Sequence, residues 1–402
     1  MVNVAILGFG TVGSGVAEVL TTNGGLIDQR VTDQVRLKYI LDVRDFTGGP
    51  YQDCFVKDFS VIENDPEVDI VVETIGGATV ALDFTTRALK AGKSVVSSNK
   101  ELVATHGYEL LQLAREKGVS YLFEASVGGG IPILRPLMSC LAANELSEVT
   151  GILNGTTNYI LTRMIKAGLT FDQALKEAQD NGYAEKDPTA DVDGHDACRK
   201  ICILAAIAFG EHVYPQQVAT EGIRGVTLED VAYADSCGCK IKLLGRAIRQ
   251  DDGKVCAFVA PHLVGGENPL AGVEDVFNAV AVNGNAVGDT MFYGRGAGKL
   301  PTASAVVADV IDIAKDVKRD HGNAWGPGSE DLIVSSDVLS SRWYVRCVAS
   351  VEDMRQKLGE IQPLARSGAP AGEVACLTTA MTQPELMEKL GGIEIGSLFR
   401  VL

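Results

Sequence analysis

A glycine loop that directly follows an apolar run at the N-terminus constrains the fold of this chain most strongly. The apolar run covers residues 2–7, and the next residues have the spacing GxGxxG, as Gly8-Phe9-Gly10-Thr11-Val12-Gly13. An amphipathic stretch begins within this loop and extends to Leu20. In such a loop Gly8 allows the tight turn, Gly10 lets the backbone approach a pyrophosphate, and Gly13 lets the helix pack closely on the strand. The order of strand, glycine loop and helix predicts a dinucleotide site at a helix N-terminus.

The rest of the N-terminal part alternates between strand-like and helical segments. Short, continuously apolar runs recur at 35–41, 69–73, 94–98 and 119–123, and helical segments lie at 79–91 and 101–117. Strands that alternate with helices form a parallel sheet, and the strands of such a sheet are buried on both faces. We therefore predict an α/β, Rossmann-type, doubly wound parallel sheet.

The pattern changes from about residue 146. Helical segments come first, at 156–167, 171–181 and 195–209, and strand-like runs follow at 239–249, 254–264, 276–282 and 286–293. Two hairpin turns are predicted, at 251–253 and 283–284. The order indicates an α+β domain whose open sheet could cover the sheet of a partner. A helix at 302–316 is expected to pack back on the first domain.

The tail reads as a small unit after a Gly/Pro-containing linker at 322–330. Strands are predicted at 343–349, 373–381 and 397–402, with helices at 351–361 and 384–390. The expected domains are 1–135 for the dinucleotide, completed by the helix at 300–320, then 136–300 for substrate and dimerisation, and 335–402 for the tail.

Composition excludes several classes of protein. The net charge of −16 argues against a nucleic-acid binder and against attraction to an acidic membrane surface. No apolar run is long enough to span a bilayer. The nine cysteines contain no CxxC pair, and the chain starts directly in a strand without a signal-peptide pattern. We expect free thiols and a cytoplasmic location.

The end of the second predicted strand bears on the choice of cofactor. Asp42 could accept hydrogen bonds from a ribose 2′-hydroxyl, which favours NAD, whereas Arg44 could pair with a 2′-phosphate, which favours NADP. Both residues could also be a solvated strand end. The cofactor is expected to be NADP or NAD, with NADP preferred.

Lys100 occupies a position that disfavours a cation. Asn99 is a good N-cap, so Lys100 falls in the first turn of the helix, at the carboxyl end of a parallel strand where ligands bind in such sheets. A role at the site and a side chain that simply points into water are equally compatible with this spacing.

An acidic loop precedes a second lysine. Glu185 and Asp191 lie upstream of a helix in which Asp196 is one turn from Lys200, and three of the four neighbours of Lys200 at helical spacing are apolar. A lysine that is partly desolvated and paired with a carboxylate could pass a proton to or from an alcohol oxygen, while the other carboxylates bind an ammonium group. An ordinary surface ion pair is the simpler alternative. A divalent metal is another, although no ligand set of recognised spacing is present.

These residues resemble the homoserine dehydrogenase family. The acidic stretch from Gly182 to Lys200 looks like the family signature, and further family-like blocks cover residues 1 to about 320 in the family's order. They begin at Gly8 and continue as Val72–Gly77, Ser98–Lys100, Glu124–Pro132, Gly151–Tyr159 and Gly296–Ser304.

The resemblance implies roles for individual residues. Lys200 and Lys100 would act at the reacting carbon, with proton transfer mainly through Lys200. Substrate would be held by Glu185, Asp191, Asp196, Gly155 and Thr156. The dinucleotide would lie against Gly8, Gly10, Thr11, Val12, Gly13, Arg44, Gly76, Ser98, Asn99, Lys100, Gly298 and Thr302. A monovalent cation, sodium in most members, would be bound by Glu124, Val127, Gly129 and Ile131.

The implied reaction is the NAD(P)-dependent interconversion of L-homoserine and L-aspartate 4-semialdehyde in threonine, methionine and isoleucine biosynthesis. A dehydrogenase of another amino-acid alcohol or aldehyde, and a non-catalytic dinucleotide sensor, are the alternatives. The family also implies a homo-oligomer, a dimer or a tetramer. The tail resembles a shortened ACT-like, ferredoxin-like unit, but no Asp-Arg-Pro-Gly-like ligand loop precedes its first helix, so binding of a regulatory amino acid stays open.

Overall fold

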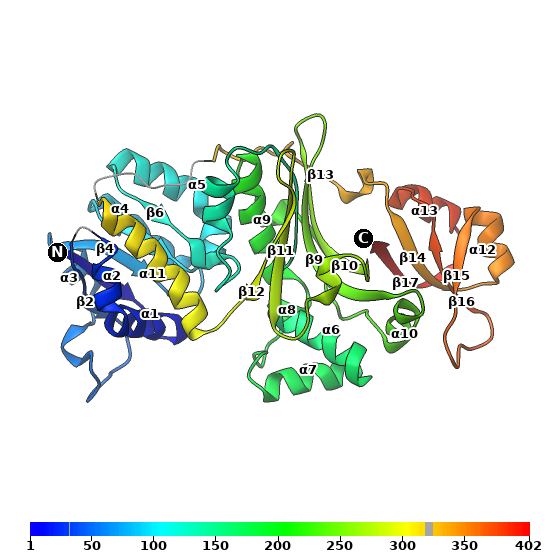
Figure 1. The fold of residues 1–402 in the computed structure, drawn as a ribbon, viewed down its shortest axis with the longest axis horizontal. Helices are drawn as coiled ribbons and strands as arrows, with labels where there is room; N and C mark the ends of the chain where they lie inside the picture. Colours follow the sequence, from blue (N-terminus) through cyan, green and yellow to red (C-terminus); the bar gives the residue numbers. More distant parts are fainter. Residues whose placement is uncertain (32, 318–324) are drawn as a thin grey trace.

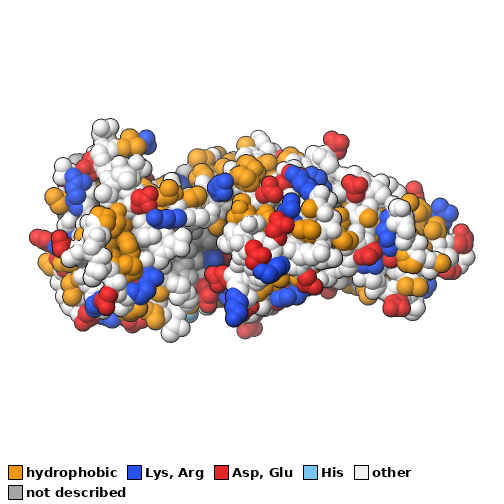
Figure 2. Space-filling model, turned by 90° about the horizontal axis from the view of Figure 1, so that it is seen from below, with side chains coloured by type: hydrophobic (Ala, Val, Ile, Leu, Met, Phe, Trp, Pro, Cys, Tyr) orange, Lys and Arg blue, Asp and Glu red, His pale blue; other side chains and the backbone are white. Residues whose placement is uncertain are grey.

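The computed structural model describes residues 1–31, 33–317 and 325–402. Three regions follow one another along its long axis: an N-terminal region of sheet and helices, a central sheet with helices, and a smaller C-terminal unit (Figure 1). The surface is hollowed between the first two regions, and acidic and basic side chains lie at the edge of the hollow (Figure 2). In the described ranges no helix combines the length and the hydropathy needed to cross a bilayer.

The first region is the predicted doubly wound parallel sheet. Its strand order is β3-β2-β1-β4-β5-β6, and every pair is parallel. The strands are β1 Val2–Leu7, β2 Val35–Leu41, β3 Phe55–Val56, β4 Val68–Glu73, β5 Ser94–Ser97 and β6 Tyr121–Leu122. The helices are α1 Thr11–Thr22, α2 Gly24–Asp28, α3 Phe59–Glu63, α4 Thr79–Lys90 and α5 Lys100–Lys117.

A helix from much later in the chain completes this region. α11 (Lys299–Lys315) starts three residues earlier than predicted and packs against α1. Gly15 of α1 allows the contact, because a Cβ there would lie 2.8 Å from the carbonyl oxygen of Lys299. Val306 and Val310 of α11 share one buried cluster with the core of the first sheet.

In the described part of the chain the second sheet has eleven strands: nine lie in the order β12-β11-β7-β9-β10-β17-β14-β16-β15, and two short ones, β8 and β13, pair with β10 outside this order. Its central strands are β7 Leu146–Ile152, β9 Cys239–Arg249, β10 Val255–Gly265, β11 Phe277–Gly284 and β12 Gly288–Arg295. Both predicted hairpins are confirmed, since β9 pairs with β10 and β11 with β12 in antiparallel fashion. β7 was not predicted, although it lies between the two hairpins and joins them.

Helices cover one face of this sheet. α6 (Gly155–Ala167) and α9 (His195–Phe209) pack on its central strands. The other elements are α7 Phe171–Asp180, α8 Thr189–Val192, α10 Leu228–Ser236, the π-helical turn Pro136–Cys140, and the short strands β8 Ala219–Thr220 and β13 Ile333–Val334, which both pair with β10. The outer strand β12 alternates between half-buried and exposed residues, and Met291 and Tyr293 are exposed on it.

The C-terminal unit has the order β-α-β-β-α-β. Its elements are β14 Arg342–Val348, α12 Val351–Leu358, β15 Ile361–Leu364, β16 Glu373–Thr378, α13 Gln383–Lys389 and β17 Glu394–Val401. The strand order β17-β14-β16-β15 is that of a ferredoxin-like split β-α-β unit. Its kinship to ACT units stays a prediction. The predicted helix at 351–361 was too long, because its last residue already begins β15.

Two observations bear on the tail, whose bounds of 335–402 as a domain stay a prediction. β17 pairs in parallel with β10, so the sheet is continuous from the central strands into the C-terminal unit. Residues 322–324 of the expected linker lie outside the described residues. The described remainder is not free chain: Trp325 is buried against Phe123 and His212, and Gly326 forms a bridge with Glu211.

Candidate functional site

The two predicted lysines meet at one carboxylate. Lys100 begins α5 in the first region, and Lys200 lies on α9 in the second. Asp196, one turn before Lys200, lies between them: its Oδ1 is 2.8 Å from Lys100 Nζ and its Oδ2 is 2.7 Å from Lys200 Nζ. Lys200 also donates to the carbonyl oxygen of Leu153 at 2.8 Å. The arrangement joins the two regions through a lysine–aspartate–lysine bridge.

Exposure differs along this bridge. The side chains of Asp196 and Lys200 are 6% and 11% exposed, whereas that of Lys100 is 40% exposed. Burial alone would raise the pKa of Asp196, but the ammonium groups of Lys200 and Lys100 hold it well below its ordinary value. The charge of Asp196 in turn raises the pKa of Lys100, against the opposing effect of burial. Asp196 therefore stays ionised and attracts both cations.

Asn154 organises the carboxylates and was missed by the sequence prediction. Its Nδ2 donates to Asp191 Oδ1 at 2.7 Å and to Asp196 Oδ2 at 2.9 Å. Its Oδ1 accepts from Thr157 N, so Asn154 is also the N-cap of α6. An asparagine between an apolar run and a helix is a typical N-cap signal, and this signal would have identified it.

The other predicted substrate residues differ in their surroundings. Burial raises the pKa of Asp191, although the hydrogen bond from Asn154 opposes the rise. Glu185 is exposed, and its side chain makes no hydrogen bond or ion pair with the residues that the structure describes. Gly155 starts α6, where a Cβ would lie 2.8 Å from the carbonyl oxygen of Val276, and Thr156 donates to the carbonyl oxygen of Tyr183 at 2.7 Å. Asp191 is thus connected to the bridge through Asn154, whereas Glu185 makes no hydrogen bond or ion pair with the residues of the bridge.

The glycine loop has the geometry of a phosphate cradle. Gly8 has φ +91°, a conformation that favours glycine. A Cβ on Gly13 would lie 1.9 Å from the carbonyl oxygen of Gly8, so only glycine allows α1 to start this close to β1. Gly10 is the N-cap, and Thr11 and Val12 are the first two helical residues, whose N–H groups have no partner within the helix.

The end of β2 carries an ion pair at the predicted cofactor position. Asp42 is buried, and Arg44 donates to its carboxylate through Nε at 3.0 Å and through Nη2 at 2.9 Å. Phe9 N donates to the same carboxylate at 2.7 Å. These hydrogen bonds, led by those from Arg44, hold the pKa of Asp42 well below its ordinary value. The guanidinium of Arg44 also lies over the ring of Phe46, and its side chain is 58% exposed.

The remaining predicted cofactor residues lie in loops that adjoin the same strand ends. Gly76 follows β4, and Ser98 and Asn99 follow β5. Asn99 donates to the carbonyl oxygens of Ile75 and Gly77, and so ties the two loops together. Gly298 has φ +132° and is the N-cap of α11, where Thr302 N donates to its carbonyl oxygen.

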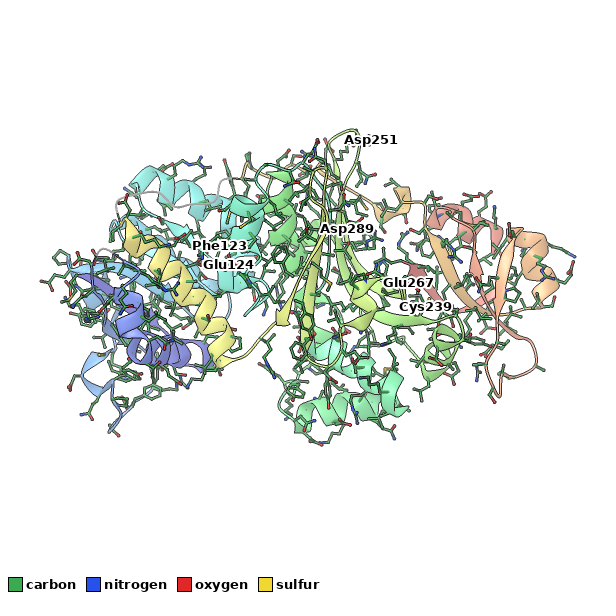
Figure 3. The ribbon with its side chains drawn as sticks, viewed as in Figure 1. Phe123, Glu124, Cys239, Asp251, Glu267 and Asp289 are labelled. Carbon is green, nitrogen blue, oxygen red and sulfur yellow. The ribbon has the colours of Figure 1, made fainter. Side chains whose placement is uncertain are left out.

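The predicted cation residues surround a glycine turn. Glu124, labelled in Figure 3, is buried beside α11, and its carboxylate accepts from three backbone N–H groups, those of Ile133, Leu134 and Arg135. Gly128 and Gly129 have positive φ angles of 75° and 53°. The carbonyl oxygens of Val127, Gly129 and Ile131 accept no hydrogen bond from any described residue.

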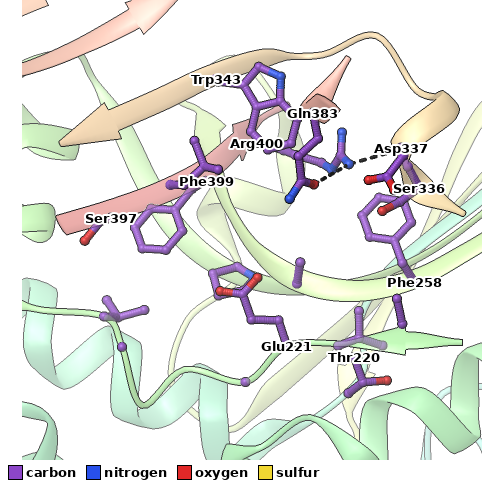
Figure 4. A pocket seen from close by; sticks show the side chains of 18 of the residues that line it. Thr220, Glu221, Phe258, Ser336, Asp337, Trp343, Gln383, Ser397, Phe399 and Arg400 are labelled. Carbon is purple, nitrogen blue, oxygen red and sulfur yellow. Dashed lines mark hydrogen bonds between the residues drawn. The ribbon is translucent and has the colours of Figure 1, made fainter. Parts of the chain in front are cut away.

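A cavity of about 580 Å³ lies elsewhere, between β10 and the strands of the C-terminal unit. Figure 4 shows Arg400 in its wall, hydrogen-bonded to Ser336 and Gln383. The guanidinium also lies over the rings of Trp343 and Phe258. Neither lysine of the bridge lines this cavity, so it is not part of the candidate site.

Comparison with known proteins agrees with this arrangement. Residues 8–124 match the family model "Homoserine dehydrogenase, NAD binding domain", and residues 132–311 match "Homoserine dehydrogenase". The homoserine dehydrogenase of Neisseria gonorrhoeae is 38% identical over 98% of this chain and 95% of its own length. That of Bacillus subtilis is 42% identical over 86% of this chain and 81% of its own length.

Solved structures are similar as well. A homoserine dehydrogenase from Thiobacillus denitrificans superimposes with a TM-score of 0.90 at 35% identity, covering 100% of this chain and 98% of the other. A hyperthermophilic archaeal homoserine dehydrogenase in complex with NADPH reaches a TM-score of 0.64 at 29% identity, over 77% of this chain and 97% of the other. The C-terminal unit is included in the first match.

Proposed function

The chain belongs to the homoserine dehydrogenase family, and we propose that the Lys100–Asp196–Lys200 bridge is its reaction centre. The enzyme is an NAD(P)-dependent oxidoreductase that interconverts L-homoserine and L-aspartate 4-semialdehyde. The nicotinamide, when bound, gives or takes the hydride. What remains for the protein is to orient the substrate, to exclude water and to move the proton of the alcohol oxygen.

Lys200 is the proton donor and acceptor in this proposal. Its ammonium is shielded from water and is held by Asp196 and by the carbonyl oxygen of Leu153, so it has one N–H left for a substrate oxygen. Lys100 is more exposed and reaches Asp196 from the opposite side, where it can polarise the substrate carbonyl. The proposal rests on the shared carboxylate of Asp196, because it brings the ammonium groups of Lys100 and Lys200 close to the same point.

The test is the turnover of Lys200→Ala, measured by NADPH absorbance with aspartate semialdehyde as substrate. Loss of a general acid and base lowers kcat by roughly 10²- to 10⁴-fold. Lys186→Ala, in the exposed part of the same loop, is the matched control and should retain wild-type turnover. Near-wild-type turnover of Lys200→Ala would refute the proton role.

The substrate ammonium is assigned to the acidic loop. Asp191 is half-buried beside the bridge, and Glu185 is free to approach a bound ligand. Gly155 and Thr156 begin α6 directly after Asn154, where their backbone would line the substrate. This assignment predicts a raised KM for homoserine in Glu185→Gln and Asp191→Asn.

The dinucleotide is assigned to the domain 1–135, completed by α11. Its phosphates would meet the N–H groups at the start of α1, and Arg44 would pair with the 2′-phosphate of NADP. The exposure of the Arg44 guanidinium and the full occupation of Asp42 by hydrogen bonds support NADP over NAD. The similar archaeal homoserine dehydrogenase in complex with NADPH supports the same choice.

A sodium ion is assigned to Glu124 and to the carbonyl oxygens of Val127, Gly129 and Ile131. The unused carbonyl oxygens support the assignment, and the carboxylate of Glu124 keeps acceptor capacity beyond its three hydrogen bonds. Sodium should raise the melting temperature over choline at equal ionic strength. Glu124→Gln should abolish this difference, and persistence of the full difference would exclude the site.

The enzyme is proposed to be a homo-oligomer, at least a dimer, formed through the open face of the domain 136–300. The exposed Met291 and Tyr293 on the outer strand support this surface. Tyr293→Asp should lower the molar mass measured by light scattering. A cytoplasmic location is proposed as well, since all nine cysteines are free thiols.

A further inference from the structure

Glu73, the last residue of β4, is a completely buried carboxylate without a cationic partner among the described residues. Its Oε1 accepts from Ile75 N at 2.7 Å, and its Oε2 accepts from Ser97 Oγ at 2.6 Å. A buried carboxylate is costly unless hydrogen bonds compensate it, and an apolar side chain at a strand end would avoid the cost. The position of Glu73 therefore points to a role that requires two acceptor oxygens.

The hydrogen bonds of Glu73 belong to a closed ring that includes the base of Lys100. Ser97 Oγ, which donates to Glu73, also accepts from Asn99 N at 3.0 Å. Asn99 Nδ2 donates back to the carbonyl oxygen of Ile75 at 3.0 Å, which closes the ring. Asn99 Oδ1 accepts from Leu102 N at 3.1 Å and caps α5, whose first residue is Lys100.

We propose that Glu73 is a positioning residue that fixes, through Ser97 and Asn99, where the Lys100 ammonium lies relative to Asp196. The two loops after β4 and β5 carry the ring, and Lys100 follows it without an intervening flexible residue. The inference rests on the proposed function of Lys100. It adds that the distance from Lys100 to Asp196, 2.8 Å, depends on a carboxylate that touches neither of them.

A carboxylate is required because both of its contacts are donors. Glutamine could accept from Ile75 N with its carbonyl oxygen, but its amide would then face Ser97 Oγ as a donor. Ser97 would receive two N–H groups, from the amide and from Asn99, and its own proton would lose the carboxylate oxygen that accepts it. Glu73→Gln keeps the size of the side chain and loosens the ring on the side that leads to Lys100.

The experiment is a double-mutant cycle on the full-length enzyme. Glu73→Gln, Lys100→Ala and the double variant are compared in kcat and in KM for both substrates. We expect Glu73→Gln to lower kcat by about tenfold to a hundredfold, the cost of a misplaced group, with KM unchanged. In the Lys100→Ala background Glu73→Gln should cause no further loss, because its effect passes through Lys100.

Ser97→Ala and Ser94→Ala provide the matched pair. Both serines are buried on β5, but Ser94 accepts from Ser120 N and lies outside the ring. Ser97→Ala should reproduce the kcat loss and the cycle, even if Glu73→Gln does not fold, and Ser94→Ala should not.

Equal loss from Glu73→Gln in both backgrounds would show a general structural role and overturn the inference. Wild-type turnover of Lys100→Ala alone would instead overturn the proposed function of Lys100, a result that the cycle separates from the first.

Discussion

Asp196 and Lys200 lie one turn apart on α9 and form an ion pair that is almost completely buried, with 2.7 Å between Oδ2 and Nζ. The second oxygen of the same carboxylate holds Lys100, which begins α5 in the first region. A single side chain therefore couples the two regions at the place where the substrate is expected to bind.

We predict that Asp196→Asn lowers kcat at least about 100-fold, because neutralising the carboxylate releases both ammonium groups from their positions. Steady-state kinetics at saturating substrates measures this loss. Asp193→Asn is the control, since Asp193 lies just before α9 and pairs with the exposed Arg224 instead of a lysine of the bridge. Retention of more than half of the wild-type kcat by Asp196→Asn would contradict the bridging role.

Arg44→Ala is predicted to change the preference between the two cofactors. Loss of a charge-assisted contact to the 2′-phosphate, about 1.5–3 kcal/mol, should raise the KM for NADPH by roughly tenfold to a hundredfold. The KM for NADH should change little. Arg36→Ala serves as control, because Arg36 lies on the same strand and pairs with Asp28. Equal effects on NADPH and NADH would argue against the 2′-phosphate contact.

The C-terminal unit should be important for stability because a buried ion pair attaches it to α10. Arg346 Nε lies 2.7 Å from Asp230 Oδ1, and Asp230 is fully buried. Arg346→Met should lower the free energy of unfolding by about 3–5 kcal/mol, because it leaves a buried charge without a cation, held only by three hydroxyl groups and the backbone N–H of Thr227. Urea denaturation measures this change.

The exposed Arg355→Met on α12 is the control for this experiment. The double variant Arg346→Met with Asp230→Asn should recover part of the loss, because it removes the unpaired charge. A double variant less stable than Arg346→Met would contradict this explanation.

The buried Glu73 should make stability depend on pH. Burial raises its pKa to about 7, although hydrogen bonds from Ser97 and Ile75 oppose the rise. The unfolded chain has a Glu pKa of about 4.3, so the folded state binds the proton more tightly. The contribution of Glu73 is thus fully present below about pH 4.3 and is lost as the pH rises through 7.

The side chain in Glu73→Gln cannot ionise, so this variant does not lose stability at position 73 as the pH rises. The wild-type free energy of unfolding, minus that of Glu73→Gln, should therefore fall between pH 5 and pH 7 and stay level above about pH 8. Urea unfolding at several pH values tests this, with the exposed Glu116→Gln as control. A difference that does not vary with pH would contradict the shifted pKa.

Local patterns predicted most elements of the fold, and the failures have non-local causes. The continuous apolar runs and the glycine loop gave the parallel sheet. β7 was missed because Leu146–Ile152 has polar residues in its first half, and its strand character depends on pairing with β9 and β11, about a hundred residues away. β15 contains Pro363, which is tolerated because β15 is an edge strand.

The site was predictable to the extent that its residues share one helix or one loop. The pairing of Asp196 with Lys200 follows from helical spacing, and the structure confirms this contact. The pairing of Asp196 with Lys100 crosses from one region to the other, so no local pattern contains it. Asn154 and Glu73 escaped notice because their importance lies in hydrogen bonds between segments that the fold brings together.

The packing of α11 on α1 has a consequence for synthesis on the ribosome. The core of the first sheet includes Val306 and Val310, so it stays incomplete until more than three quarters of the chain has been translated. The strands β7 and β9 to β12 of the central sheet all lie within residues 146–295 and are translated before α11. To complete the first region, the start of α11 must then pack against Gly15 of α1. A nascent chain stopped before residue 299 should therefore leave an apolar face of α1 exposed, where chaperones can bind.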